Sequence, residues 1–150
     1  NLKYENGISV SNEIELLTKY DKKKENILTI NKLKILSDKN FVGHEKLKDE
    51  FNTLMKNYLH EYYFDKNNNI VITYISNFFS VVPNKDSNFK DPIYKNFSII
   101  QNKLNEKDIE TSLEFLALID NSEQYFQSWI VEARKYIKFK NNINIFHKNL

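Results

Sequence analysis

The stretch DIETSLEFLALIDNSEQYFQSWIVEARKYIKF, residues 108–139, decides the fold, because it predicts two amphipathic helices joined by a tight polar turn. Its second half carries one apolar stripe at helical spacing, formed by Phe126, Trp129, Ile130, Ala133 and Ile137. Asp120 and Asn121 are turn residues, and Ser122 supplies a polar start for the next helix. The segment therefore predicts a helical hairpin.

The composition extends this prediction to the whole chain. The 150 residues, 41% of them hydrophobic, are enough for one domain with a core, so residues 1–150 are treated as a single domain. Two glycines and two prolines are too few for the many turns of a β-sandwich or a doubly wound sheet. We expect an all-α fold, a single compact domain of about six or seven amphipathic helices stacked as helical hairpins.

The N-terminal third predicts short helices. Gly7 is placed to end a first helix, and Ser9 or Ser11 to cap a second, whose apolar face is Ile14, Leu17 and Tyr20. A further helix over residues 26–37 has a predicted apolar face of Ile27, Ile30, Leu33 or Lys34, and Leu36.

The middle of the chain predicts longer helices. Residues 44–64 carry apolar side chains at helical spacing, and Pro92 suits the first turn of a helix with Ile93, Phe97, Ile100 and Leu104 on one face. Residues 70–82, IVITYISNFFSVV, are rich in β-branched side chains, which favours a strand, but their period of 3.6 and the lack of a pairing strand favour a helix. Polar residues interrupt this stretch, so it does not predict a membrane span.

Several short motifs, in order, resemble the C-terminal domain of the mitofilin family, in its alphaproteobacterial form. An early segment matches at Gly7, Ile8, Val10, Glu13, Ile14 and Leu17, and a second at Phe41, Val42, Gly43, Leu47 and Phe51. Later matches are Ser80, Val81, Val82 and Asp86, then Asp108, Ile109, Leu113, Leu116, Leu118 and Ile119, then Trp129, Ile130, Ala133 and Arg134. The chain departs from the family where prolines and an arginine are missing and where Gly43 replaces a capping threonine.

The resemblance implies a non-enzymatic membrane-organising domain. It would face the periplasm from a bacterial inner membrane, after an upstream transmembrane helix and coiled coil, so that residues 1–150 would be a fragment of a longer anchored protein. It would act by self-association as a homo-oligomer, by binding a protein partner and by contact with anionic lipid, to shape the membrane or form membrane contact sites. No catalytic residue is implied.

The residues themselves offer little for catalysis. His44, His60 and His147 are scattered, which predicts no metal site, and no phosphate loop, dinucleotide fingerprint or nucleophile elbow is present. The absence of cysteine excludes thiol catalysis and disulfides, and a net charge of +2 is too small to indicate nucleic acid. We expect no enzyme activity and no cofactor; an enzymatic function would need converging carboxylates or histidines.

Three features are candidates for binding. The aromatic residues around 58–79 indicate either a buried helix pair or a partner surface, with exposure expected at Tyr63 and Phe79, and Tyr62 beside them. Residues 133–150 contain basic but no acidic side chains, which indicates either an ordinary last helix or an anionic-lipid surface made by Lys135, Lys138, Lys140 and Phe139. Trp129 is expected to anchor the core rather than to bind a ligand.

A second function remains open from the sequence. A soluble helical-repeat adaptor would grip a peptide or protein partner in an aromatic groove between hairpins and would have no lipid role. The membrane-organising function predicts salt-sensitive vesicle binding by an oligomer, whereas the adaptor predicts a monomer that ignores vesicles.

Overall fold

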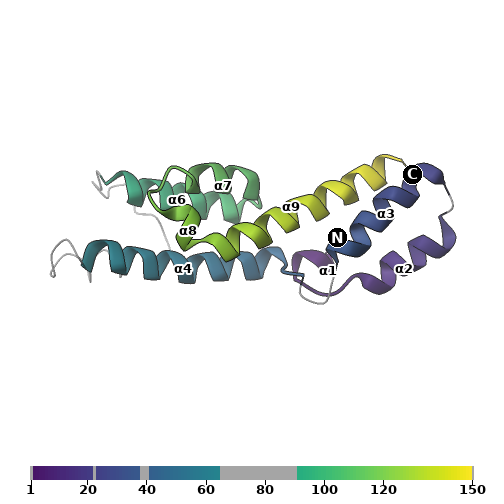
Figure 1. Ribbon diagram of the computed structural model, residues 1–150, viewed down its shortest axis with the longest axis horizontal. Helices are drawn as coiled ribbons and strands as arrows, with labels where there is room; N and C mark the ends of the chain where they lie inside the picture. The colour runs from purple at the N-terminus through teal and green to yellow at the C-terminus, as the bar shows by residue number, and fades with distance from the viewer. Residues whose placement is uncertain (1, 22, 38–40, 65–90, 150) are drawn as a thin grey trace. The chain divides into compact units, whose positions relative to one another are not determined.

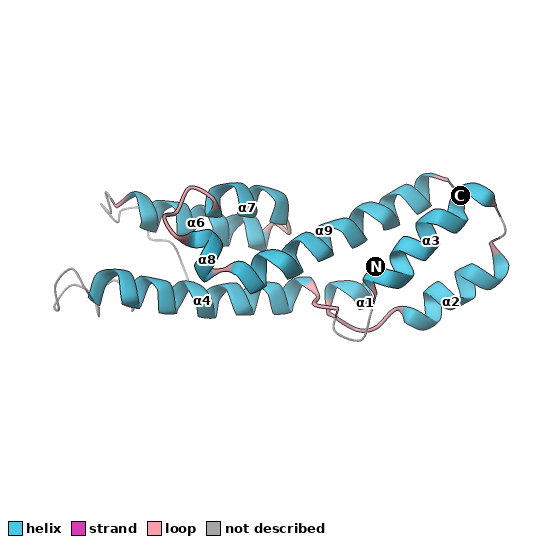
Figure 2. Ribbon diagram, in the orientation of Figure 1, coloured by secondary structure: helices cyan, strands magenta, loops and turns pink. Residues whose placement is uncertain are grey.

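The computed structural model describes residues 2–21, 23–37, 41–64 and 91–149. These residues form eight helices and no strand, which confirms the predicted all-α class (Figures 1 and 2). The helices are α1 (Leu2–Glu5), α2 (Ser11–Tyr20), α3 (Lys24–Leu36), α4 (His44–Phe64), α6 (Pro92–Asn105), α7 (Ile109–Leu116), α8 (Ser122–Tyr125) and α9 (Gln127–Lys148). The helix expected over residues 70–82 lies outside the described residues.

The chain divides into two compact units. Unit 1 comprises residues 1–47 and 128–150, and unit 2 comprises residues 48–127. In unit 1, α2 packs against α3, and in unit 2, α6 packs against α7. Both are neighbouring helices joined by a short connection, as the expected stacking of helical hairpins requires.

Aromatic side chains from both sequence segments of unit 1 pack together in its core. Tyr4, Phe41, Tyr136 and Phe139 are all buried. The Phe41 and Phe139 ring centroids are 4.7 Å apart, and the Tyr4 and Phe139 centroids 5.6 Å apart. Aromatic pairs at this separation stabilise a core beyond the area that they bury. Burial also raises the pKa of the Tyr136 hydroxyl well above its ordinary value.

The two glycines of the chain lie against each other in unit 1. Gly7 ends α1 at a φ of +67°, with its N–H donating to the Tyr4 carbonyl at 3.2 Å and the Ile8 N–H donating to the Lys3 carbonyl at 2.8 Å. This is the Schellman arrangement that the predicted stop at Gly7 requires. At Gly43, a Cβ would lie 2.0 Å from the Gly7 nitrogen and 2.5 Å from the Glu5 carbonyl oxygen. A side chain at position 43 would therefore collide with the backbone of residues 5–7.

Unit 2 has a core of aromatic rings in contact with one another. Phe51 of α4, Phe97 of α6 and Phe126 are completely buried, and their centroids lie between 5.5 and 6.1 Å apart. The Tyr58 ring lies edge-on to Phe97 at 5.5 Å, and its hydroxyl donates to the Asp120 carbonyl at 2.9 Å. The predicted apolar stripes of residues 44–64 and of the helix after Pro92 are confirmed by this packing.

The connection between α6 and α7 is a second Schellman turn. Lys107 has a φ of +60°, and the Asp108 N–H donates to the Lys103 carbonyl at 2.9 Å. The Asp108 carboxylate then accepts a hydrogen bond from the Thr111 N–H at 3.1 Å and caps α7. One aspartate thus completes the end of α6 and the start of α7.

Several predicted helix faces were wrong in detail. The buried face of α9 contains Tyr136 and Phe139 as well as Trp129 and Ala133, whereas Ile130 and Ile137 are half-buried. Ser9 and Ser11 do not cap α2 through its N-cap position; instead the Ser11 hydroxyl donates to the Ser37 carbonyl at 3.1 Å. Tyr20 and Ile27, expected inside, are 74% and 45% exposed.

Candidate functional site

The outward face of α9 carries basic and apolar side chains. Its exposed residues recur every three or four positions, so that they share one stripe opposite the buried face. We call the following set the α9 stripe: Val131, Arg134, Lys138, Ile145 and Lys148. Val131 is 57% and Ile145 48% exposed. Because residues 133–150 contain no acidic residue, the charge along this stripe is positive and is not offset within that segment.

The predicted lipid-contacting set is only partly on this face. Lys138 is exposed, whereas Lys135 and Lys140 are half-buried. Phe139 is 1% exposed and packs against Tyr4 and Phe41, so its assignment to a lipid surface is corrected. Sequence periodicity could have placed it inside, because Phe139 lies three residues after Tyr136 and seven before Phe146, which is also buried.

The buried face of α9 fixes the orientation of the stripe. Trp129 is 1% exposed, and its indole N–H donates to the Leu47 carbonyl at 2.7 Å, which confirms the expected core anchor. Ala133 and Tyr136 continue this face. A helix held by these residues cannot rotate without exposing an indole and a phenol, so the basic side chains remain directed to solvent.

Unit 1 also contains an apolar cleft of about 290 Å³. α1, α2, α3 and α9 contribute its lining, which includes Ile14, Leu17, Leu33, Phe139, Ile143 and Phe146. Lys3 and Glu13, also in the lining, form an ion pair, and the Lys3 ammonium that donates to the Glu13 carboxylate lowers the pKa of that carboxyl. The cleft suits an apolar group and has little net charge to select an ionic one.

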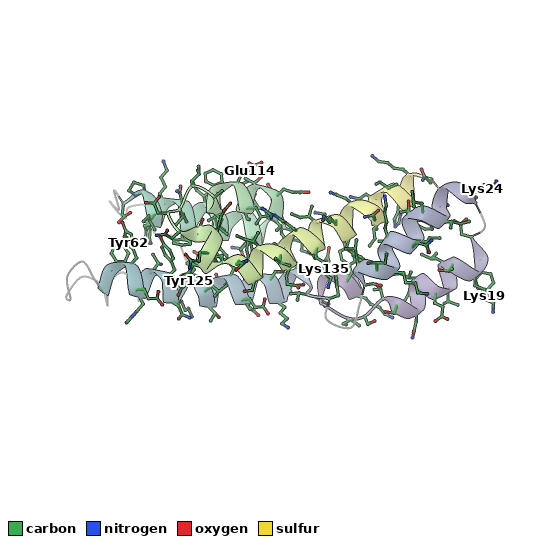
Figure 3. The ribbon with its side chains drawn as sticks, viewed as in Figure 1. Lys19, Lys24, Tyr62, Glu114, Tyr125 and Lys135 are labelled. Atoms are coloured by element: carbon green, nitrogen blue, oxygen red, sulfur yellow. The ribbon has the colours of Figure 1, made fainter. Side chains whose placement is uncertain are left out.

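The predicted partner-binding aromatics are tied into unit 2. The Tyr63 hydroxyl donates to the Asp91 carboxylate at 2.7 Å, and the Tyr62 ring stacks on Tyr58 at 6.0 Å. Both Tyr62 and Tyr63 are half-buried, which corrects the expected exposure of Tyr63 (Tyr62 is labelled in Figure 3). Phe79, the third member, lies outside the described residues. A partner surface at these tyrosines stays a prediction.

The titratable groups of the described residues do not converge on one point. The His44 ring is buried with its Nδ1 3.2 Å from the Glu45 carboxylate, whereas His60 and His147 are exposed. Over residues 2–21, 23–37, 41–64 and 91–149, no three metal-ligating side chains gather.

No protein-family model, curated protein or solved structure matches this chain. Within the described part of the chain, none of the helices is both long enough and apolar enough to cross a bilayer.

Proposed function

We propose that this chain is a non-enzymatic membrane-organising domain of the mitofilin type that its sequence resembles. It would self-associate, bind a protein partner and contact anionic lipid, and so help to shape a bacterial inner membrane from the periplasmic side or form contact sites. The α9 stripe carries this proposal, because exposed basic and apolar side chains recur together along it.

The chemistry of the α9 stripe fits an anionic lipid surface. Lysine and arginine near such a surface each contribute about 1 kcal/mol of attraction. Val131 adds apolar area before the basic residues of the stripe, and Ile145 adds it between Lys138 and Lys148. Self-association would multiply this weak contact, since several copies bound to one membrane act together.

The proposal is tested by co-sedimentation of the chain with vesicles of anionic and of neutral lipid at two salt concentrations. The double variant Arg134→Gln/Lys138→Gln removes two charges from the α9 stripe, and Lys56→Gln/Lys95→Gln removes two exposed charges from unit 2 as a matched control. We expect roughly 30-fold weaker binding for the first, from the loss of about 2 kcal/mol, and little change for the second.

Light scattering measures the mass of the chain beside this assay. An oligomer that binds anionic vesicles in a salt-sensitive way supports the proposal. Equal loss of binding in both double variants would show that net charge alone, not the α9 stripe, drives the contact. Failure of the parent chain to bind anionic vesicles at low salt would contradict the lipid contact altogether.

The cleft of unit 1 favours a second candidate function, the soluble adaptor. Its volume of about 290 Å³ and its aliphatic and aromatic lining could receive an apolar side chain of a peptide. The substitution Ile143→Arg would close the cleft to such a group. A monomer that binds no vesicles, and whose binding to a partner is lost in Ile143→Arg, would favour the adaptor over the membrane-organising function.

A further inference from the structure

The helix α3 has an unusual distribution of side chains. Its inward face buries three polar residues, with Asn26 at 0%, Ser37, just after the helix, at 2% and Thr29 at 7% exposure. Its outward face exposes three large apolar residues, with Ile35 at 76%, Leu28 at 63% and Ile27 at 45% exposure. Isolated exposed apolar residues are ordinary, but three on one helix face form a patch that calls for an explanation.

The outward residues of α3 are close together on the helix. At 100° per residue, Lys24, Leu28, Asn31 and Ile35 share the centre of the face, opposite Leu33, which is 2% exposed. Lys32 lies on one flank, and Ile27 with Lys34 lies on the other. We call this set the α3 face: Lys24, Ile27, Leu28, Asn31, Lys32, Ile35 and Lys34. All seven are exposed.

Hydrogen bonds of the buried polar residues fix the inward face of α3 against the rest of unit 1. The Asn26 amide donates to the Asp21 carboxylate at 2.6 Å, and the Lys23 N–H donates to the other oxygen of Asp21 at 3.0 Å. The Ser37 carbonyl accepts from the Ser11 hydroxyl. These contacts at both ends of α3 hold its orientation, so the apolar residues of the α3 face cannot turn inward.

The charge of the α3 face identifies the class of its occupant. Lys24, Lys32 and Lys34 surround the apolar residues, and Glu25 is the one acidic residue in the sequence of α3, so the helix carries a net positive charge. A second copy of the face would set lysine against lysine, which is unfavourable. None of the three exposed apolar residues lines the cleft, whose α3 contribution is Leu33, so a peptide in the cleft would not cover them. Apolar side chains flanked by lysines suit the headgroup region of an anionic bilayer, where the stems lie in the apolar layer and the ammonium groups reach the phosphates.

We propose that the α3 face inserts into an anionic lipid surface and is the apolar anchor of unit 1. This proposal rests on the proposed membrane function and adds to it the helix that enters the bilayer, whereas the α9 stripe supplies attraction over distance. Figure 3 shows Lys24 at the beginning of α3 and Lys19 near the end of α2, on either side of the short connection between the two helices. The Lys23 ammonium donates to the Asn149 carbonyl at 3.3 Å, so the start of α3 lies beside the end of α9.

The absence of cysteine from the chain allows a direct test. Leu28→Cys, Ile35→Cys and Leu118→Cys are each labelled with an environment-sensitive fluorophore in the otherwise unchanged chain. Leu118 is the matched control, since it is 67% exposed and belongs to unit 2. With anionic vesicles we expect a blue shift and quenching by acyl-chain quenchers for the labels at 28 and 35, and neither change at 118.

A second pair of variants separates insertion from electrostatic attraction. The double variant Leu28→Gln/Ile35→Gln keeps all charges and replaces two residues with a good helix former. We expect it to bind vesicles about tenfold more weakly than the parent chain, and we expect this difference to persist at high salt. Leu118→Gln should bind as the parent chain does. Circular dichroism checks that each variant is folded.

The outcomes distinguish this proposal from the proposed function. Salt-sensitive binding with no spectral change at 28 and 35 would overturn insertion of α3 and leave the membrane function standing. A blue shift at 28 and 35 without vesicles, at concentrations where the mass doubles, would assign the α3 face to a second copy instead. No binding of any vesicle would overturn both proposals.

Discussion

The described residues of the two units differ in how many large apolar side chains they leave exposed. Among the described residues there are nine large apolar side chains that are exposed, and eight of these belong to unit 1, with Leu118 as the one in unit 2. In unit 2, Phe51, Phe97 and Phe126 are completely inside. In unit 1, α3 buries Asn26 while exposing Leu28 and Ile35. Apolar area left on the surface does not stabilise the fold, so its concentration in unit 1 supports the proposal that unit 1 is the binding unit.

The largest expected effect is in the core of unit 2. Phe126→Ala removes a ring that lies 5.5 Å from Phe51 and 6.0 Å from Phe97, and it leaves a cavity. We expect a loss of about 3–5 kcal/mol in the free energy of unfolding, measured by urea denaturation. Below the melting temperature of the variant, vesicle binding should be unchanged. A variant that stayed folded but lost vesicle binding would contradict the division of roles between the units.

The glycine pair should be the most sensitive point of unit 1. Gly43→Ala places a methyl group 2.0 Å from the Gly7 nitrogen, so the two backbones must separate. We expect a loss of about 3 kcal/mol or more in stability, seen as a lower Tm. Gly7→Ala is the matched comparison: its Cβ would lie 3.1 Å from the Gly43 nitrogen, and its φ of +67° alone costs about 1–2 kcal/mol. Equal effects of the two substitutions would argue against the close approach at Gly43.

A smaller effect is expected at Trp129. Trp129→Phe keeps an aromatic ring but removes the indole N–H that donates to the Leu47 carbonyl. The loss should be about 1–3 kcal/mol, because a buried hydrogen bond to a carbonyl is removed. Urea denaturation of this variant beside the parent chain measures it. A neutral result would show that packing alone orients α9 and its stripe.

Acid should destabilise unit 1 through its carboxylates. The Lys23 N–H and the Asn26 amide, in that order, lower the pKa of Asp21, and the Lys3 ammonium lowers that of Glu13. A carboxyl group whose pKa is lower in the folded chain than in the unfolded chain stabilises the fold when the pH is above the unfolded pKa, which is 3.8 for Asp21. This stabilisation is lost as the pH falls through the pKa of the folded chain. We expect Tm to fall between pH 6 and pH 3 by less in Asp21→Asn than in the parent chain. Equal falls would contradict this contribution.

Sequence periodicity predicted the fold class and most of unit 2. The stripes of α4 and α6 repeat at 3.6 with large apolar residues, so Phe51, Phe97 and Leu104 could be placed inside from spacing alone. The turn at Gly7 was also predictable, because glycine suits the left-handed position at a helix end. The contact between Gly7 and Gly43 was not, since it joins residues distant in sequence.

The candidate site was less predictable, and α3 shows why. Apolar residues occur on both its faces, so periodicity cannot say which face is buried, and Ile27 was placed inside. Hydrogen bonds between Asp21 and Asn26 and between Ser11 and Ser37 determine which face of α3 is buried. In α9 only Lys138 of the three predicted lysines is exposed, and Phe139 is buried because Tyr136, which the predicted stripe omits, belongs to the inward face.

The most direct test of unit 1 as the binding unit is hydrogen exchange of the full chain. It is measured by mass spectrometry with and without anionic vesicles. Peptides that cover α3 and α9 should exchange more slowly with vesicles present, because insertion of α3 and lipid contact of the α9 stripe stabilise these helices. Peptides from α6 and α7 should exchange at the same rate in both samples. Slower exchange confined to α6 and α7, with α3 and α9 unchanged, would contradict the account.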